Sequence, residues 1–151
     1  MLPLWLALLS PPSICAPLCE CMRGPSVIEA YRQNDVVLLG RVIDVRDTTT
    51  GPPLPKQFNS VTIRGPAVVA TIEAIKWWKG PFDYSINVIT GRGGGDCGVP
   101  FVVDGVYLIY AARASTGAKS DSVYRTTACD RSGPPKFVLR EVLVLDSLAR
   151  R

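Results

Sequence analysis

Four of the five cysteines in this 151-residue chain constrain its fold more than any other sequence feature. Cys19 and Cys21 are separated by one residue, whereas Cys97 and Cys129 stand alone much further along the chain. An even set of cysteines in an exported domain indicates a disulfide framework. A bridge between Cys19 and Cys21 would close a very small, strained ring, so each is expected to pair with one of the two distant cysteines. The spacing leaves both of those pairings open.

A four-thiolate zinc site is the rival interpretation of the same cysteines. Such sites usually combine two Cys-x-x-Cys pairs. This chain has one Cys-x-Cys and two isolated cysteines, so the pattern favours disulfides. The chain has 0 histidines, and histidine is the commonest metal ligand. We therefore expect no cofactor and no metal of the protein's own.

The N-terminal stretch predicts export. Residues 1–9 are uncharged and apolar, as in the h-region of a secretory signal. They are too few to span a membrane, which takes about 20 apolar residues. The stretch lacks the basic n-region of a secretory signal, which is expected if the start codon is misplaced or the sequence is truncated. A cut after Ala16 fits the small-residue rule, so we expect residues 1–16, with Cys15, to be removed. The mature chain, without a lipid anchor or membrane span, would be secreted to an extracellular or periplasmic space.

The composition argues against an enzyme. Without histidine the chain lacks the commonest general base and the usual partner of a Ser or Cys nucleophile. Two carboxylate pairs, Asp44 with Asp47 and Asp96 with Asp104, have the residue types for acid and base work. No nucleophile or apolar pocket is specified around them, so we interpret them as solvated carboxylates and expect no catalytic residue.

The positive charge is mild and dispersed. A net charge of +4 comes from 17 basic and 13 acidic residues, whereas a nucleic-acid binder is expected to show a clustered basic stripe. The nearest approach is Lys76-Trp77-Trp78-Lys79, which we interpret as a strand end whose lysine stems cover apolar surface. One of its tryptophans is expected in the core, and the other is a secondary candidate contact. We expect no nucleic-acid partner.

Residue patterns predict two helices and five strands. Ser26-Val27-Ile28-Glu29 has the form of a capping box and predicts a short helix. Gly40 is placed for a bulge that bends the first strand. The region 48–66, rich in Pro and Gly, predicts a long exposed loop. Apolar residues at helical spacing predict a helix over 137–148. Alternating apolar residues predict strands at 36–45, 67–77, 84–90, 106–111 and 123–128.

These elements predict one mainly β domain over residues 17–151, since typical domains have roughly 100 to 150 residues. Five strands with a bent first strand favour an OB-type barrel with a short N-terminal helix and a C-terminal helix. A β-sandwich would normally need about seven strands.

The glycine-rich run 93–98 contains Gly-x-Gly-x-x-Gly, the form of a phosphate-binding loop. That loop needs a helix after it, and here another strand follows, so the pattern does not predict a nucleotide site. We expect these glycines to let Cys97 approach the N-terminal cysteines closely without Cβ clashes.

Several segments, taken in order, together resemble the netrin-like module, and in particular the N-terminal domain of tissue inhibitors of metalloproteinases. The resemblance covers most of residues 19–130, although the chain lacks the further cysteine pair and the C-terminal domain of those inhibitors. The segments that carry it are Cys19-Glu20-Cys21, the strand 36–45 after a short helix, Trp78-Lys79-Gly80, Cys97-Gly98, Gly105-Val106-Tyr107-Leu108-Ile109-Tyr110 and Cys129.

The resemblance implies a five-stranded OB barrel with bridges Cys19–Cys97 and Cys21–Cys129. In those inhibitors the first Cys of the Cys-x-Cys is the mature N-terminus, and its α-amine and carbonyl chelate the protease's zinc. By resemblance Cys19 would be that ligand, since zinc can displace the proton of an α-amine whose pKa is about 8.

Two residues bear on this chelation. If the signal is cut after Ala16, the nitrogen of Cys19 is a planar amide and cannot bind a metal. Glu20 stands where the inhibitors carry a small Thr or Ser that enters the protease's specificity pocket. Burying its carboxylate without a partner would cost several kcal/mol.

The expected function is that of an exported, non-enzymatic protein-binding module, with a zinc metalloprotease as its most specific partner. The alternative is an OB-fold binder of single-stranded nucleic acid or glycan that uses aromatic residues and lysines on the barrel face. The expected contact surface consists of Cys19, Glu20, Cys21, Arg92, Gly95 and Asp96.

Overall fold

The computed structural model describes residues 19, 21–54, 56–58, 61, 63, 65–114, 123–134 and 139–150. The predicted signal at 1–16 lies outside the described residues. In chain order the elements are α1 (Val27–Gln33), β1 (Val36–Asp47), η1 (Lys56–Phe58), β2 (Val68–Lys79), β3 (Ser85–Thr90), η2 (Gly94–Asp96), β4 (Val106–Arg113), β5 (Val123–Arg125), η4 (Ala128–Asp130) and α2 (Leu139–Ala149), where η marks a 3-10 turn.

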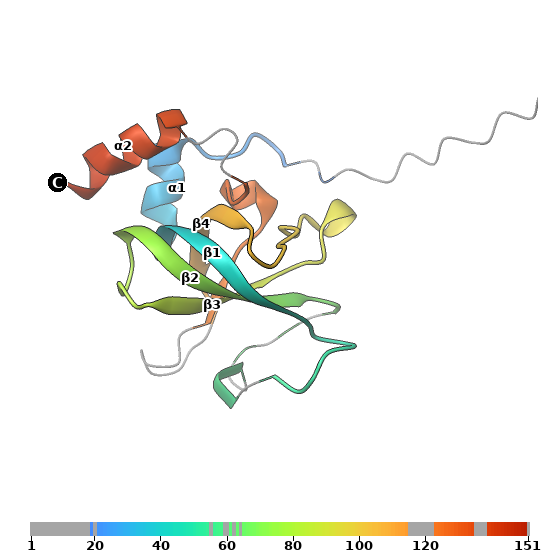
Figure 1. The fold of residues 1–151 in the computed structure, drawn as a ribbon. Coiled ribbons are helices and arrows are strands. Elements are labelled where there is room, and N and C mark those ends of the chain that lie inside the picture. The colour runs from blue at the N-terminus through green and yellow to red at the C-terminus, as the bar shows by residue number, and fades with distance from the viewer. Residues whose placement is uncertain are drawn as a thin grey trace, which may run out of the picture.

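The five strands form a closed barrel in the order β1-β2-β3-β5-β4, with the two helices outside it (Figure 1). β3 and β5 run parallel, and the other neighbouring strands are antiparallel. This arrangement confirms the predicted OB-type barrel with one helix before the strands and one after them.

Gly40 lies where the first strand bends. The register between β1 and β2 shifts between Leu39 and Gly40, as expected of a bulge. A Cβ on Gly40 would stand 2.3 Å from Cγ2 of Ile72 and 2.7 Å from Cδ1 of Leu38. Only glycine fits here, because the bent strand is pressed against interior side chains.

The apolar residues form three clusters. The largest fills the barrel and includes Ile72, Val88 and Tyr124. A second joins the outer surface of the barrel to α1 and α2 through Leu145 and others. The third lies under the region between β1 and β2 and contains Phe58.

The helix α1 is fixed at both ends. Its N-terminus has the predicted capping box, in which Ser26 Oγ accepts from Glu29 N and Glu29 Oε2 accepts from Ser26 N. At its C-terminus Nζ of Lys79 donates to the carbonyl oxygens of Tyr31 at 2.9 Å and Asn34 at 2.5 Å. Lys79 thus attaches the end of β2 to the end of α1.

The helix α2 is held against β2 by Asp146. Its Oδ1 accepts from Lys76 Nζ and from Trp78 Nε1, each at 2.6 Å. Trp78 is only 3% exposed, whereas Trp77 is half-buried, which agrees with the prediction of one core tryptophan. Both lysines of this segment therefore serve the packing of the helices.

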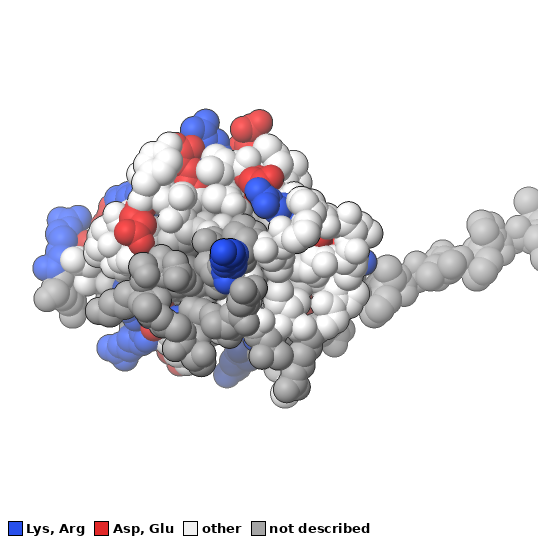
Figure 2. Space-filling view, turned by 90° about the horizontal axis from the view of Figure 1, so that it is seen from below, with Lys and Arg blue, Asp and Glu red and all other residues white. Residues whose placement is uncertain are grey.

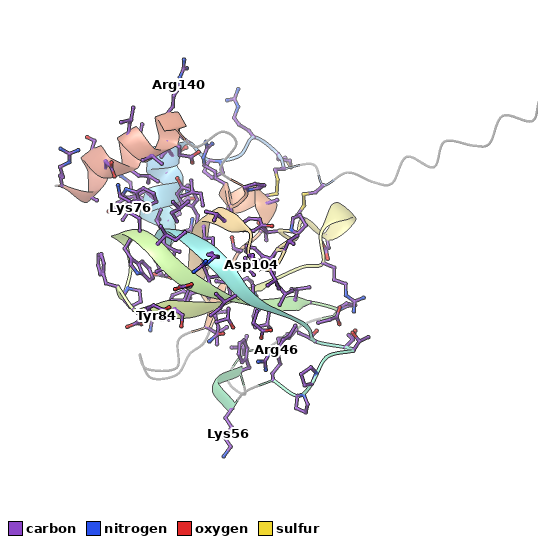
Figure 3. The ribbon with its side chains drawn as sticks, viewed as in Figure 1. Arg46, Lys56, Lys76, Tyr84, Asp104 and Arg140 are labelled. Atoms are coloured by element: carbon purple, nitrogen blue, oxygen red, sulfur yellow. A yellow bond between two sulfur atoms is a disulfide. The ribbon has the colours of Figure 1, made fainter. Side chains whose placement is uncertain are left out.

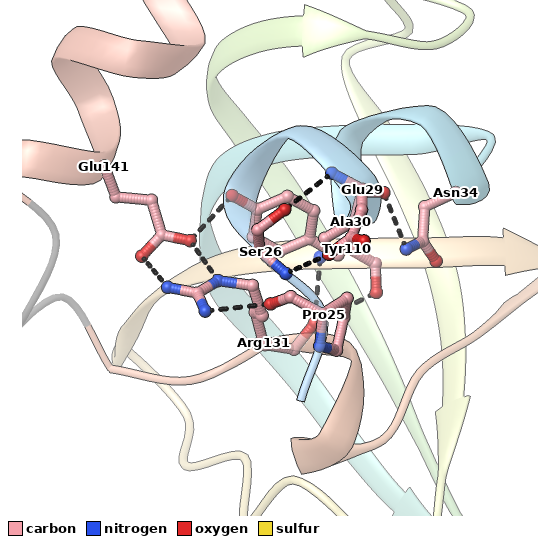
Figure 4. Close-up of polar contacts among 9 residues, drawn as sticks. Pro25, Ser26, Glu29, Ala30, Asn34, Tyr110, Arg131 and Glu141 are labelled. Carbon is pink, nitrogen blue, oxygen red and sulfur yellow. Dashed lines mark hydrogen bonds and ion pairs between the residues drawn. The ribbon is translucent and has the colours of Figure 1, made fainter. Parts of the chain in front are cut away.

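A buried polar network also ties α2 to the barrel (Figure 4). The Tyr110 hydroxyl donates to Oε1 of Glu141 at 2.8 Å, and Arg131 Nε donates to the same oxygen at 2.8 Å. Arg131 Nη1 also donates to the carbonyl of Pro25 at 3.0 Å. The segment before α1 is thereby connected to η4 and α2.

The structure differs from the prediction in the region 48–66 and at the end of the last strand. The region 48–66 is not simply an exposed loop, because Phe58 and Val61 are buried and pack with Ile89 on the barrel. The last strand is shorter than predicted and ends at Arg125. Thr126 is fully buried, and its Oγ1 donates to the Tyr110 carbonyl at 2.6 Å, which directs the chain into η4.

Candidate protein-binding edge

Two disulfides hold the segment that carries Cys19 and Cys21, which we call the leading segment, against the barrel (Figure 3). Cys19 is bonded to Cys97 and Cys21 to Cys129, with Cα–Cα distances of 5.0 and 5.3 Å. These are the bridges that the resemblance implies. The bridges join cysteines that are separated by 78 and by 108 positions in the sequence, and they gather all four cysteines into one cluster beside η2 and η4.

The glycine-rich loop is built around Asp96. Its carboxylate accepts three backbone N–H groups, from Arg92 at 2.7 Å and from Gly93 and Gly98 at 2.9 Å each. The N–H of Gly98 is the main cause that holds the pKa of the Asp96 carboxyl below its usual value. Asp96 is therefore an ionised cap of the loop.

The glycines of this loop have a different role from the one predicted. A Cβ on Gly98 would lie 2.2 Å from backbone atoms of Gly91, and one on Gly91 would lie 2.6 Å from the Asp96 carboxyl. Gly93 and Gly94 have positive φ angles. The glycines thus allow the loop to close on itself and around Asp96.

Arg92 joins this loop to the one after β1. Its Nη2 lies 2.7 Å from the Asp47 carboxylate, whose Oδ1 also accepts from Thr49 N at 2.8 Å. Arg92 is the main cause that lowers the pKa of Asp47 below its usual value. The ion pair is partly exposed, so it contributes little energy but sets the relative position of the two loops.

We call the surface formed by Cys19, Cys21, Arg92, Gly95, Asp96 and Cys97 the disulfide edge. The structure brings five of the six predicted contact residues together with Cys97, and Cys21, Arg92, Gly95 and Asp96 are exposed. Glu20, the sixth predicted contact residue, lies outside the described residues.

A hollow of about 410 Å³ adjoins the disulfide edge. Its lining includes Cys21, Cys129, Leu108, Arg131 and Glu141. The charged groups inside it are already paired with each other. The hollow therefore offers apolar surface next to the edge, and among the described residues that line it the charged pair Arg131 and Glu141 is already joined.

Three of the four carboxylates considered for acid and base work make structural contacts, and for the fourth, Asp104, the backbone N–H donates to Val42 O at 2.8 Å. Asp44 pairs with Arg46 at 2.5 Å, Asp47 with Arg92, and Asp96 caps its loop. These contacts give the carboxylates of Asp44, Asp47 and Asp96 a conformational role.

Exposed aromatic side chains lie at the turn between β2 and β3, and the sequence reasoning missed them. Phe82 and Tyr84 are 67% and 74% exposed. The Phe82 ring packs on Trp77 with ring centroids 5.7 Å apart, and the Tyr84 hydroxyl donates to Glu73. Phe82 has a φ of 62°, unusual for an aromatic residue. The Gly80-Pro81 sequence before it was the available signal of a tight turn.

The described surface carries mixed charge. In Figure 2 basic and acidic side chains are scattered over the described part of the face seen from below, without a stripe of one sign. Within the described part of the chain, no helix has both the length and the apolar character that crossing a membrane requires.

Comparison of the sequence with models of known protein families and with curated proteins returns no match. The likeness to the netrin-like module therefore depends on the ordered residues quoted above and on nothing broader.

Proposed function

We propose that this protein is an exported, non-enzymatic protein-binding module of the netrin-like type, and that the disulfide edge is its contact surface. The observation that carries the proposal is the convergence of four segments at one place. The Cys19–Cys97 bridge fixes the leading segment on the glycine loop, and the Cys21–Cys129 bridge fixes it on η4. The Arg92–Asp47 pair fixes the loop after β1 beside the glycine loop. Rigid segments lose little conformational entropy when a partner binds, which favours affinity.

The most specific activity of such an edge is inhibition of a zinc metalloprotease. In a chain that begins at Cys19, the α-amine and the carbonyl of Cys19 would chelate the protease's zinc. The Cys19–Cys97 bridge would hold both groups in place. A chain that begins at Pro17 has only an amide nitrogen at Cys19, so it should not inhibit by this mechanism.

The test compares two forms of the oxidised protein, one beginning at Cys19 and one at Pro17. N-terminal sequencing of the secreted protein shows which form occurs. Hydrolysis of a fluorogenic peptide by a zinc metalloprotease catalytic domain measures inhibition. We expect inhibition by the Cys19 form and its loss when the α-amine is carbamoylated. Equal inhibition by both forms, or by neither, would overturn the chelation mechanism.

Glu20→Thr provides a second arm. Removing a carboxylate that must enter the protease pocket should strengthen inhibition by the Cys19 form at least tenfold, since burying that charge costs several kcal/mol. Asp83→Asn, an exposed charge removal at the turn between β2 and β3, is the matched control and should change nothing. If both substitutions have the same effect, Glu20 does not face the partner and the proposed contact surface is wrong.

The alternative, an OB-fold binder of nucleic acid or glycan, loses one of its supports. Lys76 and Lys79 are bound to Asp146 and to the end of α1. These two lysines therefore already have partners within the fold, and we do not favour the alternative.

A further inference from the structure

We propose that the four cysteines, when reduced, form a binding site for one Zn²⁺ ion. All four Sγ atoms lie within 4.8 Å of one another. Cys19 Sγ is 3.8 Å from both Cys21 Sγ and Cys129 Sγ, its non-bonded neighbours. This inference concerns the reduced chain and does not depend on the proposed function.

The spacing fits a tetrahedral zinc centre. With Zn–S bonds of about 2.3 Å, the sulfurs of such a centre are about 3.8 Å apart. Two contacts between the bridges already have that length. The bonded pairs, which a disulfide keeps about 2 Å apart, would each separate by about 2 Å through side-chain rotation. A Cys-x-Cys with two isolated cysteines is unusual for zinc in sequence, but the fold brings the four sulfurs together.

Contacts other than the bridges position the backbone around the sulfurs. Cys97 N donates to Gly94 O at 3.2 Å, and Cys97 O accepts from Ala128 N at 2.8 Å, which connects the loops that carry Cys97 and Cys129. Arg131 holds the carbonyl of Pro25, four residues after Cys21. A folded chain would therefore keep the four thiols close to one another after reduction.

A phosphine reductant takes up the oxygen of one water molecule for each bridge, and the bridge gains two electrons and two protons to give two thiols. Two bridges yield four thiols. Binding of Zn²⁺ then releases the four thiol protons, because thiolates are the ligands. The site carries a net charge of −2 and is accessible, since Cys21 is exposed.

The test uses the full mature chain under anaerobic conditions with a phosphine. Titration with Zn²⁺ against a chromogenic chelator should give one ion per chain, and the oxidised protein should bind none at the same concentrations. Co²⁺ as a spectroscopic probe should give thiolate charge-transfer bands and the d–d bands of tetrahedral coordination. Zn²⁺ should raise the thermal midpoint of the reduced chain, because the folded state holds the preformed site.

Two matched double variants serve as controls, Cys19→Ser with Cys97→Ser and Cys21→Ser with Cys129→Ser. Each leaves two of the four ligands, so each should bind Zn²⁺ at least 100-fold more weakly than the reduced wild type. Equal binding by a variant would overturn the four-ligand site. So would Zn²⁺ uptake without a rise in the thermal midpoint or recovery of the near-ultraviolet circular dichroism, because the metal would then bind an unfolded chain.

Discussion

Removal of the Cys19–Cys97 bridge should cost about 4 kcal/mol of the free energy of unfolding. With a sequence separation of 78 residues, this bridge alone would contribute about 4.5 kcal/mol in the chain-entropy model. The Cys21–Cys129 bridge shortens the loop, because the path from Cys19 to Cys97 can run through it over roughly 34 residues, which lowers the figure to about 4 kcal/mol.

The perturbation is Cys19→Ser with Cys97→Ser in the oxidised protein. Guanidinium unfolding followed by tryptophan fluorescence gives the free energy, and limited proteolysis reports on the leading segment. Cys21→Ser with Cys129→Ser is the matched comparison and should cost a similar amount, because its bridge is then closed through the same shortened loop. Without either bridge the loss should reach about 8 kcal/mol, comparable to the whole stability of a typical domain.

A loss below about 1 kcal/mol for the first variant would refute this reasoning, since removal of a native bridge from a small secreted domain typically costs about 2 to 5 kcal/mol. It would mean that the leading segment is not constrained by Cys97. Unchanged protease resistance of that segment would lead to the same conclusion.

Three further predictions concern the barrel, the glycine loop and the buried network. Gly40→Ala should cost up to about 3 kcal/mol in thermal unfolding by overpacking, whereas Gly133→Ala, where a Cβ meets nothing within 4 Å, should cost under about 0.5 kcal/mol. The folded-state pKa of Asp96 is lowered, so its ionised carboxylate stabilises the folded protein above the ordinary Asp pKa of about 3.9. This stabilisation is lost as the pH falls from there through the lowered folded-state pKa. Loop amide shifts in NMR spectra should move below about pH 4 in the wild type and not in Asp96→Asn. Tyr110→Phe removes the hydroxyl bound to Glu141 and should cost about 1 to 2 kcal/mol in guanidinium unfolding.

Local patterns were sufficient for most of the fold. The capping box at Ser26 and Glu29 determines where α1 begins, and both of its hydrogen bonds form between near neighbours. Gly40 indicated the bulge because a glycine within a β-branched run often marks a bulge or a close approach of the backbone. Such signals depend on residues within a turn of each other, so they can be interpreted before the tertiary structure is known.

The remaining features depend on contacts between distant segments. Arg92 and Asp47 are 45 residues apart, and neither has a local pattern that indicates the other. Phe58 lies among Pro and Gly residues, which predict an exposed loop, yet the barrel supplies an apolar surface that buries it. The sequence predicts Lys79 at a strand end with its stem over apolar surface, whereas its Nζ binds carbonyl oxygens at the end of α1. In each case the partner is defined only by the closed barrel.

The disulfide edge combines two kinds of support that differ in chemistry. Three contacts hold the glycine loop, η4 and the loop after β1. They are the Asp96 cap, the backbone hydrogen bond from Ala128 to Cys97, and the ion pair of Arg92 with Asp47. The leading segment is different, because Met22 is 96% exposed and contributes no burial. Its position beside the loops therefore depends mainly on the bonding of the four sulfurs. Two bridges or a bound zinc ion would each retain this segment at the edge, whereas with free thiols its main remaining link would be the hydrogen bond from Arg131 to the Pro25 carbonyl.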